Sequence, residues 1–310
     1  MTVVSFPDPS WRDGVGPLDG IRPVIWDPRE PVPDIPVEVV VAPYMRPASE
    51  LAAVAGMPSA RLVQLLTAGY DGALEAVPEN VAVANAAGVH DASTAELAVG
   101  LALAALRGIP ETVRAADRGE WLRMDGRLAL ADRRVLIVGY GSVGRAIATR
   151  LRPFEVAITA VAGRARGGDD LVDRVYGTAE LASLLPGHDV VIVAVPLTET
   201  TRGLVGEDFL AAVPDGALVV NVARGQVADT AAILRHAGRL AFALDVTDPE
   251  PLPADHPLWS APKVLITPHV GGATSAFRPR AVALLRDQLA RIAAGEVPRH
   301  LVRHATYRSG

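Results

Sequence analysis

Three glycines with the spacing G-x-G-x-x-G, Gly139, Gly141 and Gly144, follow the short apolar run at residues 135–138. Residues 145–151 then continue with the composition of a helix. Between a strand and a helix, the first glycine permits a tight turn, the second lets a pyrophosphate approach the backbone, and the third lets the helix pack on the strand. The segment therefore predicts a βαβ unit that binds a dinucleotide. A tight turn without a ligand is the alternative.

Short runs rich in β-branched residues alternate with alanine- and leucine-rich segments along the chain. This alternation is typical of a parallel α/β sheet. At 310 residues the chain is long enough for two domains, each with its own core. In the first hundred residues, strands are expected at residues 23–26, 37–41, 62–66 and 81–84.

A long apolar helix is expected to carry the chain from one domain to the other. It begins near Ser93 or Thr94, with Glu96 close behind as in an N-cap, and it ends at Gly108. Because it is apolar almost all round, we expect it to be buried. The chain should return to the first domain with a second long helix, which ends at Gly295.

Composition excludes several classes of protein. The formal net charge of −5 gives no electrostatic reason to expect nucleic acid or a membrane surface as a partner. The absence of cysteine excludes disulfides, thiolate metal sites and cysteine nucleophiles, and no histidine shows metal-ligand spacing. No apolar run approaches the ~20 residues of a membrane span, and the N-terminus lacks a signal-peptide pattern. We therefore expect a cytoplasmic protein without a metal.

The strand after the glycine turn indicates which nicotinamide cofactor binds. NAD sites usually end this strand with an acidic residue that binds the ribose hydroxyls. Here the strand ends near Val161, Ala162 takes the place of the acid, and Gly163, Arg164 and Arg166 follow. Two guanidinium groups can bind a 2′-phosphate that no carboxylate repels. NADP(H) is therefore predicted as the preferred cofactor, with NAD(H) possible, unless both arginines are solvated loop charges.

Five motifs resemble the D-isomer-specific 2-hydroxyacid dehydrogenase family, and they occur in the family's order. They are VGYGSVGRAIA, AVPLTETTRGLVG, VVNVARGQVAD, ALDVTDPEPLPADHPL and VLITPHVGGAT. The resemblance covers most of the chain. The fold it implies has two doubly wound parallel-sheet domains with a cleft between them. A Rossmann-type domain spans residues 103–271, and a flavodoxin-like substrate domain spans residues 1–102 and 272–310.

The resemblance also implies site residues. The family's catalytic arginine, acid and histidine fall on Arg224, Glu250 and His269. The stretch after Val161 looks like that of the NADPH-using glyoxylate and hydroxypyruvate reductases. Further cofactor contacts are expected at Ser142, Val143, Val195, Pro196, Thr201, Val222, Ala223, Asp245 and Gly271.

The chemistry of a 2-oxo acid explains why these residue types are needed. Arg224 can grip the carboxylate and polarise the neighbouring ketone. His269 can give a proton to the developing alkoxide, and Glu250 would favour its charged form. Asp245 is expected to orient the nicotinamide end of the cofactor. The alternatives are an ion pair of Arg224 with Asp229 or Asp245, and a His269 that only caps a loop.

The first domain is expected to contribute substrate contacts. Ala68 and Gly69 follow a strand, and their backbone N–H groups could bind the substrate carboxylate, as in the family's small-residue turn. The loop with Tyr44 and Met45 is a second pocket candidate. Arg46 in that loop either reads a second anionic group or is solvated. Arg278 and Arg280 pose the same question. Ala68 also argues against phosphite oxidation, because phosphite-oxidising relatives have a lysine there.

These expectations combine into one function and one alternative. We expect NADPH-dependent reduction of a small 2-oxo acid, such as glyoxylate or hydroxypyruvate, to the D-2-hydroxy acid. A homodimer is expected, with the apolar helix and the segment through Trp121 at the subunit interface. The alternative is a nicotinamide-dinucleotide-sensing binding protein or corepressor. The presence of Arg224, Glu250 and His269 together disfavours it, because sensing alone needs no acid, clamp or orienting carboxylate.

Overall fold

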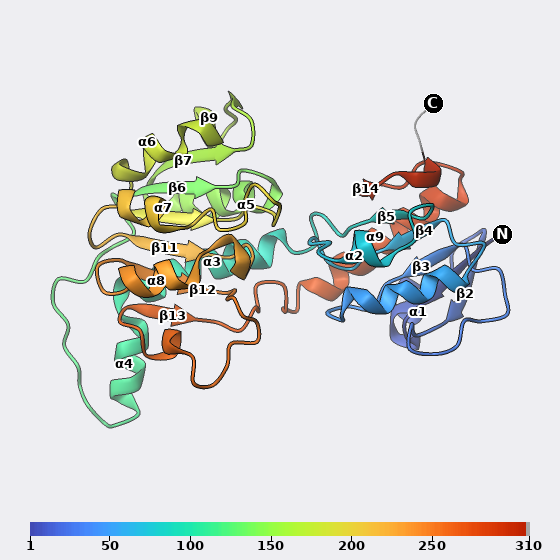
Figure 1. The fold of residues 1–310 in the computed structure, drawn as a ribbon, viewed down its shortest axis with the longest axis horizontal. Coiled ribbons are helices and arrows are strands. Elements are labelled where there is room, and N and C mark those ends of the chain that lie inside the picture. Colours follow the sequence, from blue (N-terminus) through green and yellow to red (C-terminus); the bar gives the residue numbers. More distant parts are fainter. Residues whose placement is uncertain (308–310) are drawn as a thin grey trace. The chain divides into compact units, whose positions relative to one another are not determined.

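The computed structural model describes residues 1–307, which form two compact units (Figure 1). Unit 1 contains Met1–His90 and the C-terminal segment that begins at Ser275, and unit 2 contains Asp91–Thr274. The expected boundary between residues 102 and 103 differs from this division because it falls inside helix α3 (Asp91–Arg107). That helix packs on a helix and two strands of unit 2, so its whole length belongs to that unit.

Unit 1 contains a six-stranded sheet in the order β14-β5-β4-β3-β1-β2. Its strands are β1 (Thr2–Phe6), β2 (Ile21–Ile25), β3 (Val39–Val41), β4 (Leu62–Gln64), β5 (Ala82–Ala84) and β14 (Leu301–Arg303). The first five are parallel and β14 is antiparallel to β5. The parallel order 2-1-3-4-5 is that of flavodoxin-like sheets. The expectations for residues 1–100 omitted β1.

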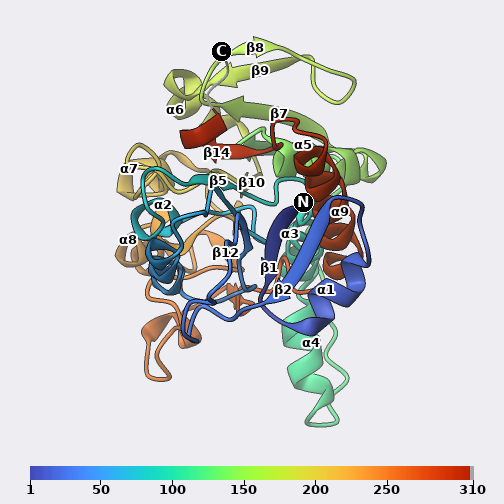
Figure 2. The ribbon, with the colours of Figure 1, turned by 90° about the vertical axis from the view of Figure 1, so that its right-hand side faces the viewer.

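Helices cover both faces of this sheet, so its inner strands β3, β4 and β5 are buried on both sides. One core gathers alternate strand residues such as Val4 and Leu62 under α1 (Pro9–Val15) and α9 (Phe277–Ala293), which lie together in Figure 2. The opposite core gathers residues such as Val63. It is covered by α2 (Ala73–Ala76) and the 3₁₀ helix η1 (Ala48–Gly56).

Unit 2 contains an eight-stranded sheet in the order β13-β12-β11-β10-β6-β7-β9-β8. Its strands are β6 (Arg134–Val138), β7 (Ala157–Ala162), β8 (Arg166–Gly167), β9 (Arg174–Gly177), β10 (Val190–Val193), β11 (Leu218–Asn221), β12 (Ala241–Leu244) and β13 (Val264–Ile266). All are parallel except β8. Strands β9-β7-β6-β10-β11-β12 follow the six-stranded Rossmann order 3-2-1-4-5-6, and β8 and β13 add one strand at each edge. The expected α/β fold with two mostly parallel sheets is confirmed.

The helices of unit 2 lie on both faces of its sheet. α3 and α5 (Ser142–Leu151) cover one core, and the other core is covered by α6 (Leu181–Leu184), α7 (Glu207–Ala212) and α8 (Thr230–His236). α3 begins at Asp91, so the N-cap expected at Ser93 or Thr94 is wrong, because both residues lie inside the helix. It ends as expected before Gly108, whose backbone is left-handed.

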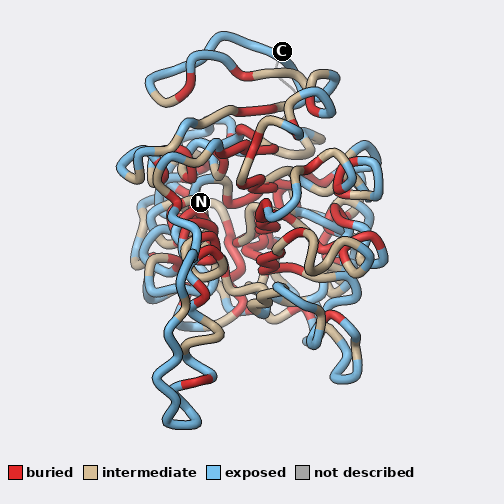
Figure 3. The backbone as a smooth tube through the Cα atoms, turned by 90° about the vertical axis from the view of Figure 1, so that its left-hand side faces the viewer, coloured by how far each residue is buried: buried red, intermediate tan, exposed pale blue. Residues whose placement is uncertain are grey.

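The chain leaves the body of unit 2 at α4 (Ile109–Ala116). This helix and the segment after it are mostly exposed (Figure 3), whereas the central strands β6, β10, β11 and β12 are almost entirely buried. Among residues 1–307, no single helix is both long and apolar enough to cross a membrane. Only α3 and α4 taken together pass that test, and they are bent by 69° at the break between them.

Candidate functional site

The glycine turn of unit 2 has the close contacts that its spacing predicts. A Cβ atom on Gly139 would lie 2.4 Å from the carbonyl oxygen of Ala194, and one on Gly144 would lie 2.0 Å from that of Gly139. Around Gly141, by contrast, a Cβ would meet no atom within 4 Å. Helix α5 starts directly after it at Ser142, and no side chain caps its first N–H groups. These residues therefore fit a dinucleotide phosphate group, which would bind in the open space at the helix start.

The two arginines after β7 differ in their surroundings. Arg166 donates from its guanidinium to the carbonyl oxygen of Tyr140 at 2.7 Å, so it is not simply a solvated charge. Arg164 is exposed and its side chain makes no hydrogen bond or ion pair with residues 1–307. Ala162 ends β7, and Gly163 is exposed. Of the two cations, Arg164 is the one left available to an anion.

Three neighbouring strands bring the other predicted residues to one edge of the sheet. β11, β12 and β13 are adjacent and parallel, and they end at Asn221, Leu244 and Ile266. Arg224 and His269 follow the first and the last of these ends, and Asp245 follows the middle one. Ligands of open α/β sheets bind at this carboxyl edge. Val195 and Pro196 after β10, and Val222 and Ala223 after β11, lie at the same edge.

Asn221 fixes the backbone on both sides of Arg224. Its amide group donates to the carbonyl oxygen of Arg224 at 3.1 Å and accepts the N–H of Ala223 at 3.0 Å. The guanidinium of Arg224 is half-buried and donates to the carbonyl oxygen of Ala223 at 2.7 Å. Asn221 is absent from the residues expected from sequence. Its signal is a buried amide at the last position of an otherwise apolar strand.

Gly225 lets the segment after β12 approach the segment that carries Arg224. A Cβ on Gly225 would lie 1.8 Å from the carbonyl oxygen of Thr247, so only glycine fits. Two hydroxyl groups hold the next residues in place. Thr230 donates to the carbonyl oxygen of Asp248 at 2.7 Å, and Thr247 donates to that of Pro249 at 2.9 Å. The backbone that leads to Glu250 is therefore fixed against the arginine segment.

His269 and Glu250 form a direct pair. The ring Nδ1 of His269 lies 2.5 Å from Oε1 of Glu250. The other ring nitrogen, Nε2, has no partner among the residues that the structure describes. His269 also has a left-handed backbone (φ 52°), which is uncommon for a residue other than glycine, and its N–H donates to the carbonyl oxygen of Asp245 at 2.7 Å. The histidine thus does more than cap a loop: its ring is oriented by a carboxylate and leaves one nitrogen open.

Asp245 is buried, with 2% of its surface exposed. Its carboxylate accepts the hydroxyl of Thr267 at 2.6 Å and the N–H groups of Val270 and Gly271 at 2.9 Å each. The contacts of Asp245 therefore hold the loop that carries His269. Its role toward the nicotinamide stays a prediction.

In unit 1, the turn at Ala68 and Gly69 is held by its carbonyl groups. The amide of Asn85 donates to the carbonyl oxygen of Ala68, and the hydroxyl of Thr67 donates to that of Gly69, both at 2.7 Å. The N–H groups of Ala68 and Gly69 donate to no atom of residues 1–307. The turn therefore leaves two adjacent donors that could bind an anion.

The loop with Tyr44 and Met45 is partly committed to packing. The ring of Tyr44 stacks on Phe277 with 3.9 Å between the ring centroids, and its burial raises the pKa of the Tyr44 hydroxyl. Met45 is exposed and has a left-handed backbone. Met45 is therefore the member of this loop whose side chain is open to a ligand.

Arg46 is neither solvated nor open to a substrate, so both expectations for it are wrong. Its guanidinium pairs with Asp27 at 2.8 Å and with Glu50. Hydrogen bonds from Arg29 and Arg46 hold the pKa of Asp27 well below its usual range. Arg278 is also engaged, because it donates to a backbone carbonyl of α1 and lies over a tryptophan ring. Arg46 is therefore not available to a second anionic group, whereas Arg278 is exposed and binds α1 through one guanidinium nitrogen.

Thr201, another expected cofactor contact, is hydrogen-bonded within its own loop. The hydroxyl of Thr201 donates to the carbonyl oxygen of Pro196 at 2.6 Å, within the loop after β10. In the part of the chain that the structure describes, no three histidine, aspartate or glutamate side chains come together in a group that could hold a metal ion.

Comparisons with known proteins find similar sequences over more than half of the chain. The family model described as D-isomer specific 2-hydroxyacid dehydrogenase, NAD binding domain, matches residues 99–271. A glyoxylate reductase/hydroxypyruvate reductase of Mus musculus is 35% identical over 224 residues, which are 69% of this chain and 68% of that protein.

Solved structures are similar over almost the whole chain. A D-isomer specific 2-hydroxyacid dehydrogenase of Xanthobacter autotrophicus Py2, in complex with NADPH and MES, matches with a TM-score of 0.80 and 28% identity over 99% of each chain. The NADPH-dependent glyoxylate/hydroxypyruvate reductase of Sinorhizobium meliloti, in complex with NADP and malonate, matches with a TM-score of 0.78 and 26% identity. That match covers 100% of this chain and 98% of the other.

Proposed function

Because the chain belongs to the D-isomer specific 2-hydroxyacid dehydrogenase family of NAD(P)-binding oxidoreductases, we propose that it reduces a small 2-oxo acid to the D-2-hydroxy acid with NADPH. Glyoxylate and hydroxypyruvate are the proposed model substrates, since the mouse relative is named for them. The observation that carries the proposal is the pair of His269 and Glu250, which leaves Nε2 of the histidine free at the same sheet edge as Arg224.

The guanidinium of Arg224 is proposed to bind the substrate carboxylate. A planar fork of donors can hold a carboxylate in one orientation and place a further N–H near the adjacent ketone oxygen. The backbone that carries this guanidinium is fixed by Asn221 and by the contact of Gly225 with Thr247. Fixed donors stabilise charge on the ketone oxygen without having to reorganise during the reaction.

His269 is proposed as the general acid. Its Nε2 donates a proton to the ketone oxygen as negative charge develops there, while Glu250 at Nδ1 stabilises the charged ring. In the reverse direction the neutral ring takes the proton from the hydroxyl group. Asp245 holds the loop of His269 through Val270 and Gly271 and so keeps the imidazole in place.

The glycine turn and the first N–H groups of α5 are proposed to hold the cofactor phosphates. Gly139, Gly141 and Gly144 leave the backbone open there, and Ser142 and Val143 begin the helix. When bound, the reduced nicotinamide supplies the hydride that reaches the ketone carbon.

Two observations support NADPH over NADH. Ala162 stands where an acidic residue would bind the ribose hydroxyls, and Arg164 next to it is exposed without an internal partner. A 2′-phosphate bound there would gain charge-assisted hydrogen bonds, worth about 1.5–3 kcal/mol each. The two structural relatives described above contain NADPH or NADP.

In unit 1, taken by itself, Ala68 and Gly69 are the proposed substrate contacts because their N–H groups are free to bind an anion. Tyr44 and Met45 are proposed as further contacts, with Met45 the more exposed of the two.

Turnover on a panel of 2-oxo acids tests the proposal. Stopped-flow oxidation of NADPH should be fastest with small acids such as glyoxylate and hydroxypyruvate. NADPH should be preferred over NADH by about tenfold or more, as one charge-assisted hydrogen bond implies. Tight NADPH binding without turnover on any acid would instead support a nicotinamide-sensing binding protein or corepressor.

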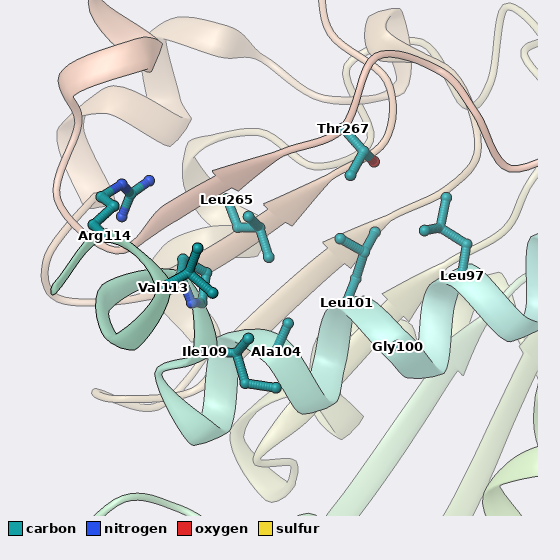
Figure 4. Close-up of a pocket in the computed structure, with 10 residues that line it drawn as sticks. Leu97, Gly100, Leu101, Ala104, Ile109, Val113, Arg114, Leu265 and Thr267 are labelled. Atoms are coloured by element: carbon teal, nitrogen blue, oxygen red, sulfur yellow. The ribbon is translucent and has the colours of Figure 1, made fainter. Parts of the chain in front are cut away.

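We further propose that the protein is a homodimer. An apolar groove of about 470 Å³ lies between α3, α4 and β13, and Leu101, Val113 and Leu265 are among the residues that line it (Figure 4). Trp121, after α4 in the same unit, is 93% exposed. A chain that carries both an apolar groove and an exposed tryptophan can pair with a second copy by a twofold axis.

Changing Trp121 to glutamate should weaken that dimer. Buried interface tryptophans often contribute 2 kcal/mol or more, so the dissociation constant should rise about 30-fold or more. Sedimentation equilibrium over a concentration series measures this constant. Trp259→Glu is the matched control, because Trp259 is also exposed but lies outside α4 and the segment after it. A monomeric parent protein, or equal effects of the two variants, would contradict the proposal.

A further inference from the structure

Tyr140 and Asp169 connect the glycine turn to the loop that carries Arg164 and Arg166. Tyr140 stands between the first two glycines of the turn, and its backbone N–H donates to the carbonyl oxygen of Val161 in β7 at 3.0 Å. Its side chain is buried, with 4% of the residue exposed, and its hydroxyl lies 3.1 and 3.2 Å from the two carboxylate oxygens of Asp169. The mechanism proposed above uses neither side chain.

Asp169 is the centre of a hydrogen-bond network in the turn between β8 and β9. Its carboxylate accepts the N–H groups of Leu171 at 2.9 Å and Val172 at 3.3 Å, and it pairs with Arg145 at 2.7 Å. Arg145 lies near the start of α5, directly after the glycine turn. The turn between β8 and β9 is therefore attached both to Tyr140 and to the helix that would face the cofactor phosphates.

The network has consequences for the charges and the pKa values of its members. Burial and the hydrogen bond to Asp169 raise the pKa of Tyr140 to about 12, so its hydroxyl keeps its proton and remains a donor at neutral pH. Burial acts to raise the pKa of Asp169. The hydrogen bonds from Leu171, Tyr140 and Val172 and the charge of Arg145 outweigh it and lower that pKa. Arg145 also pairs with Asp170 at 2.6 Å, which compensates negative charge that would repel a phosphate.

Arg166 attaches the segment after β7, residues 163–166, to the glycine turn. Its guanidinium donates to the carbonyl oxygen of Tyr140 at 2.7 Å and lies 5.9 Å from the centroid of the Tyr140 ring. Residues 163–165 therefore span a short gap between β7, which ends at Ala162, and an arginine that is bound to the glycine turn. Arg164 is in the middle of this gap, and its side chain has no partner among residues 1–307.

We infer that Tyr140 and Asp169 are positioning residues for cofactor selection, which hold residues 163–166 so that Arg164 meets the 2′-phosphate. Arg166 fixes the loop to the turn, and Arg164 is the residue that contacts the phosphate. The inference rests on the NADPH preference proposed above. Without the Tyr140 hydroxyl, the glycines of the turn keep their contacts and only the loop loses an anchor. Affinity for the 2′-phosphate should therefore fall more than affinity for the dinucleotide itself.

The Tyr140→Phe variant tests this directly, because it removes one hydroxyl and keeps the buried ring. Its dissociation constant for NADPH, measured by fluorescence titration, should rise about three- to tenfold, the size of an ordinary net hydrogen bond, because the Tyr140 hydroxyl acts on the phosphate only through the loop. The constant for NADH should change by less than about twofold. Inhibition by 2′,5′-ADP should weaken while inhibition by 5′-AMP is kept. Tyr176→Phe is the matched control: Tyr176 lies on β9 in the same hairpin, and its hydroxyl makes no hydrogen bond with residues 1–307.

A second variant and a double variant complete the test. Asp169→Asn keeps an oxygen that can accept the N–H of Leu171 but removes the charge. It should shift the selectivity in the same direction, and it replaces Tyr140→Phe if that protein fails to fold. Because both changes break one link, the double variant should lose no more selectivity than the more affected single variant. Equal losses for NADPH and NADH, or additive effects, would overturn the inference.

Arg164→Ala separates this inference from the proposed function. If it abolishes NADPH selectivity while Tyr140→Phe and Asp169→Asn keep it, the positioning role is wrong and the NADPH proposal stands. If the parent protein binds NADH as well as NADPH, the cofactor proposal fails, and the inference fails with it.

Discussion

Replacing His269 with alanine lowers the rate of 2-oxo acid reduction by about 10²- to 10⁴-fold, while NADPH binding stays nearly unchanged. The ring is the proton donor with a free Nε2, and its Nδ1 is held by Glu250 at 2.5 Å. Its loss leaves water as the proton donor. The glycine turn that would bind the phosphates lies on other elements, β6 and α5, so cofactor affinity should be kept. Single-turnover rates and cofactor titrations on the same variant measure the two quantities.

The chain offers a close control for this variant. His236 also pairs with a glutamate, since its Nε2 lies 2.8 Å from Glu207, but it stands at the end of α8 and away from the carboxyl edge of the sheet. His236→Ala should keep nearly full turnover. The turnover of Glu250→Gln should lie between those of His269→Ala and His236→Ala. In this variant the ring of His269 loses the negative charge beside Nδ1 but keeps a hydrogen-bond partner. Near-normal reduction by His269→Ala would refute its role as the general acid.

Changing Arg224 to lysine should lower kcat/KM for the oxo acid by about 10²- to 10³-fold, the usual effect of removing one donor from a developing oxyanion. Lysine keeps the positive charge but replaces a planar fork with a single point, so the carboxylate and the ketone oxygen are no longer held together. Steady-state saturation curves should show a higher KM for the acid and a lower kcat. The KM for NADPH should be little changed.

The Arg235→Lys variant is the control for Arg224→Lys. Arg235 pairs with Glu207 on the exposed side of α8, where a lysine should serve almost as well. Unchanged saturation by the oxo acid in Arg224→Lys would remove this guanidinium from the substrate site. A loss confined to NADPH binding would do the same.

The site could be predicted from sequence where its signals are local. The glycine turn is a short pattern between a strand and a helix, and Arg224 and His269 each follow an apolar run by a few residues. A parallel sheet then brings these run ends to one edge without further information. The pairing of Glu250 with His269 was predicted from the resemblance and the chemistry, and the structure places their side chains in contact.

Contacts between residues distant in sequence could not be predicted in this way. Arg46 pairs with Glu50 four residues later, but its second partner, Asp27, is 19 residues earlier and in another loop. Tyr140 and Asp169 are 29 residues apart, and neither belongs to a motif that would point to the other. Asn221 gives only the weak signal of an amide after three apolar residues. In each case the partner is decided by how strands and turns pack, which a local pattern does not contain.

The ends of elements were predicted less well than their existence. The start of α3 was placed at Ser93 or Thr94 because capping residues occur there, yet the helix already begins at Asp91. The division between the units lies directly before this helix, after His90, and not after residue 102. β1 was not expected. Its side chains point alternately to the two faces of the sheet, and both sets, Val4 and Phe6 on one face and Val3 and Ser5 on the other, are buried.

Unit 1 is built from both ends of the chain, and this sets the order in which the protein can mature on the ribosome. The edge of β5 is completed only by β14, and the core around Trp11 and Val15 is completed only by α9. Translation proceeds at roughly 5–20 residues per second, so the first ninety residues wait on the order of ten seconds or more for these partners. Unit 2 is continuous in the chain and can fold during that wait. Until these partners emerge, the nascent N-terminal segment has an open strand edge and an uncovered apolar face, the two features that make partly folded chains prone to aggregate.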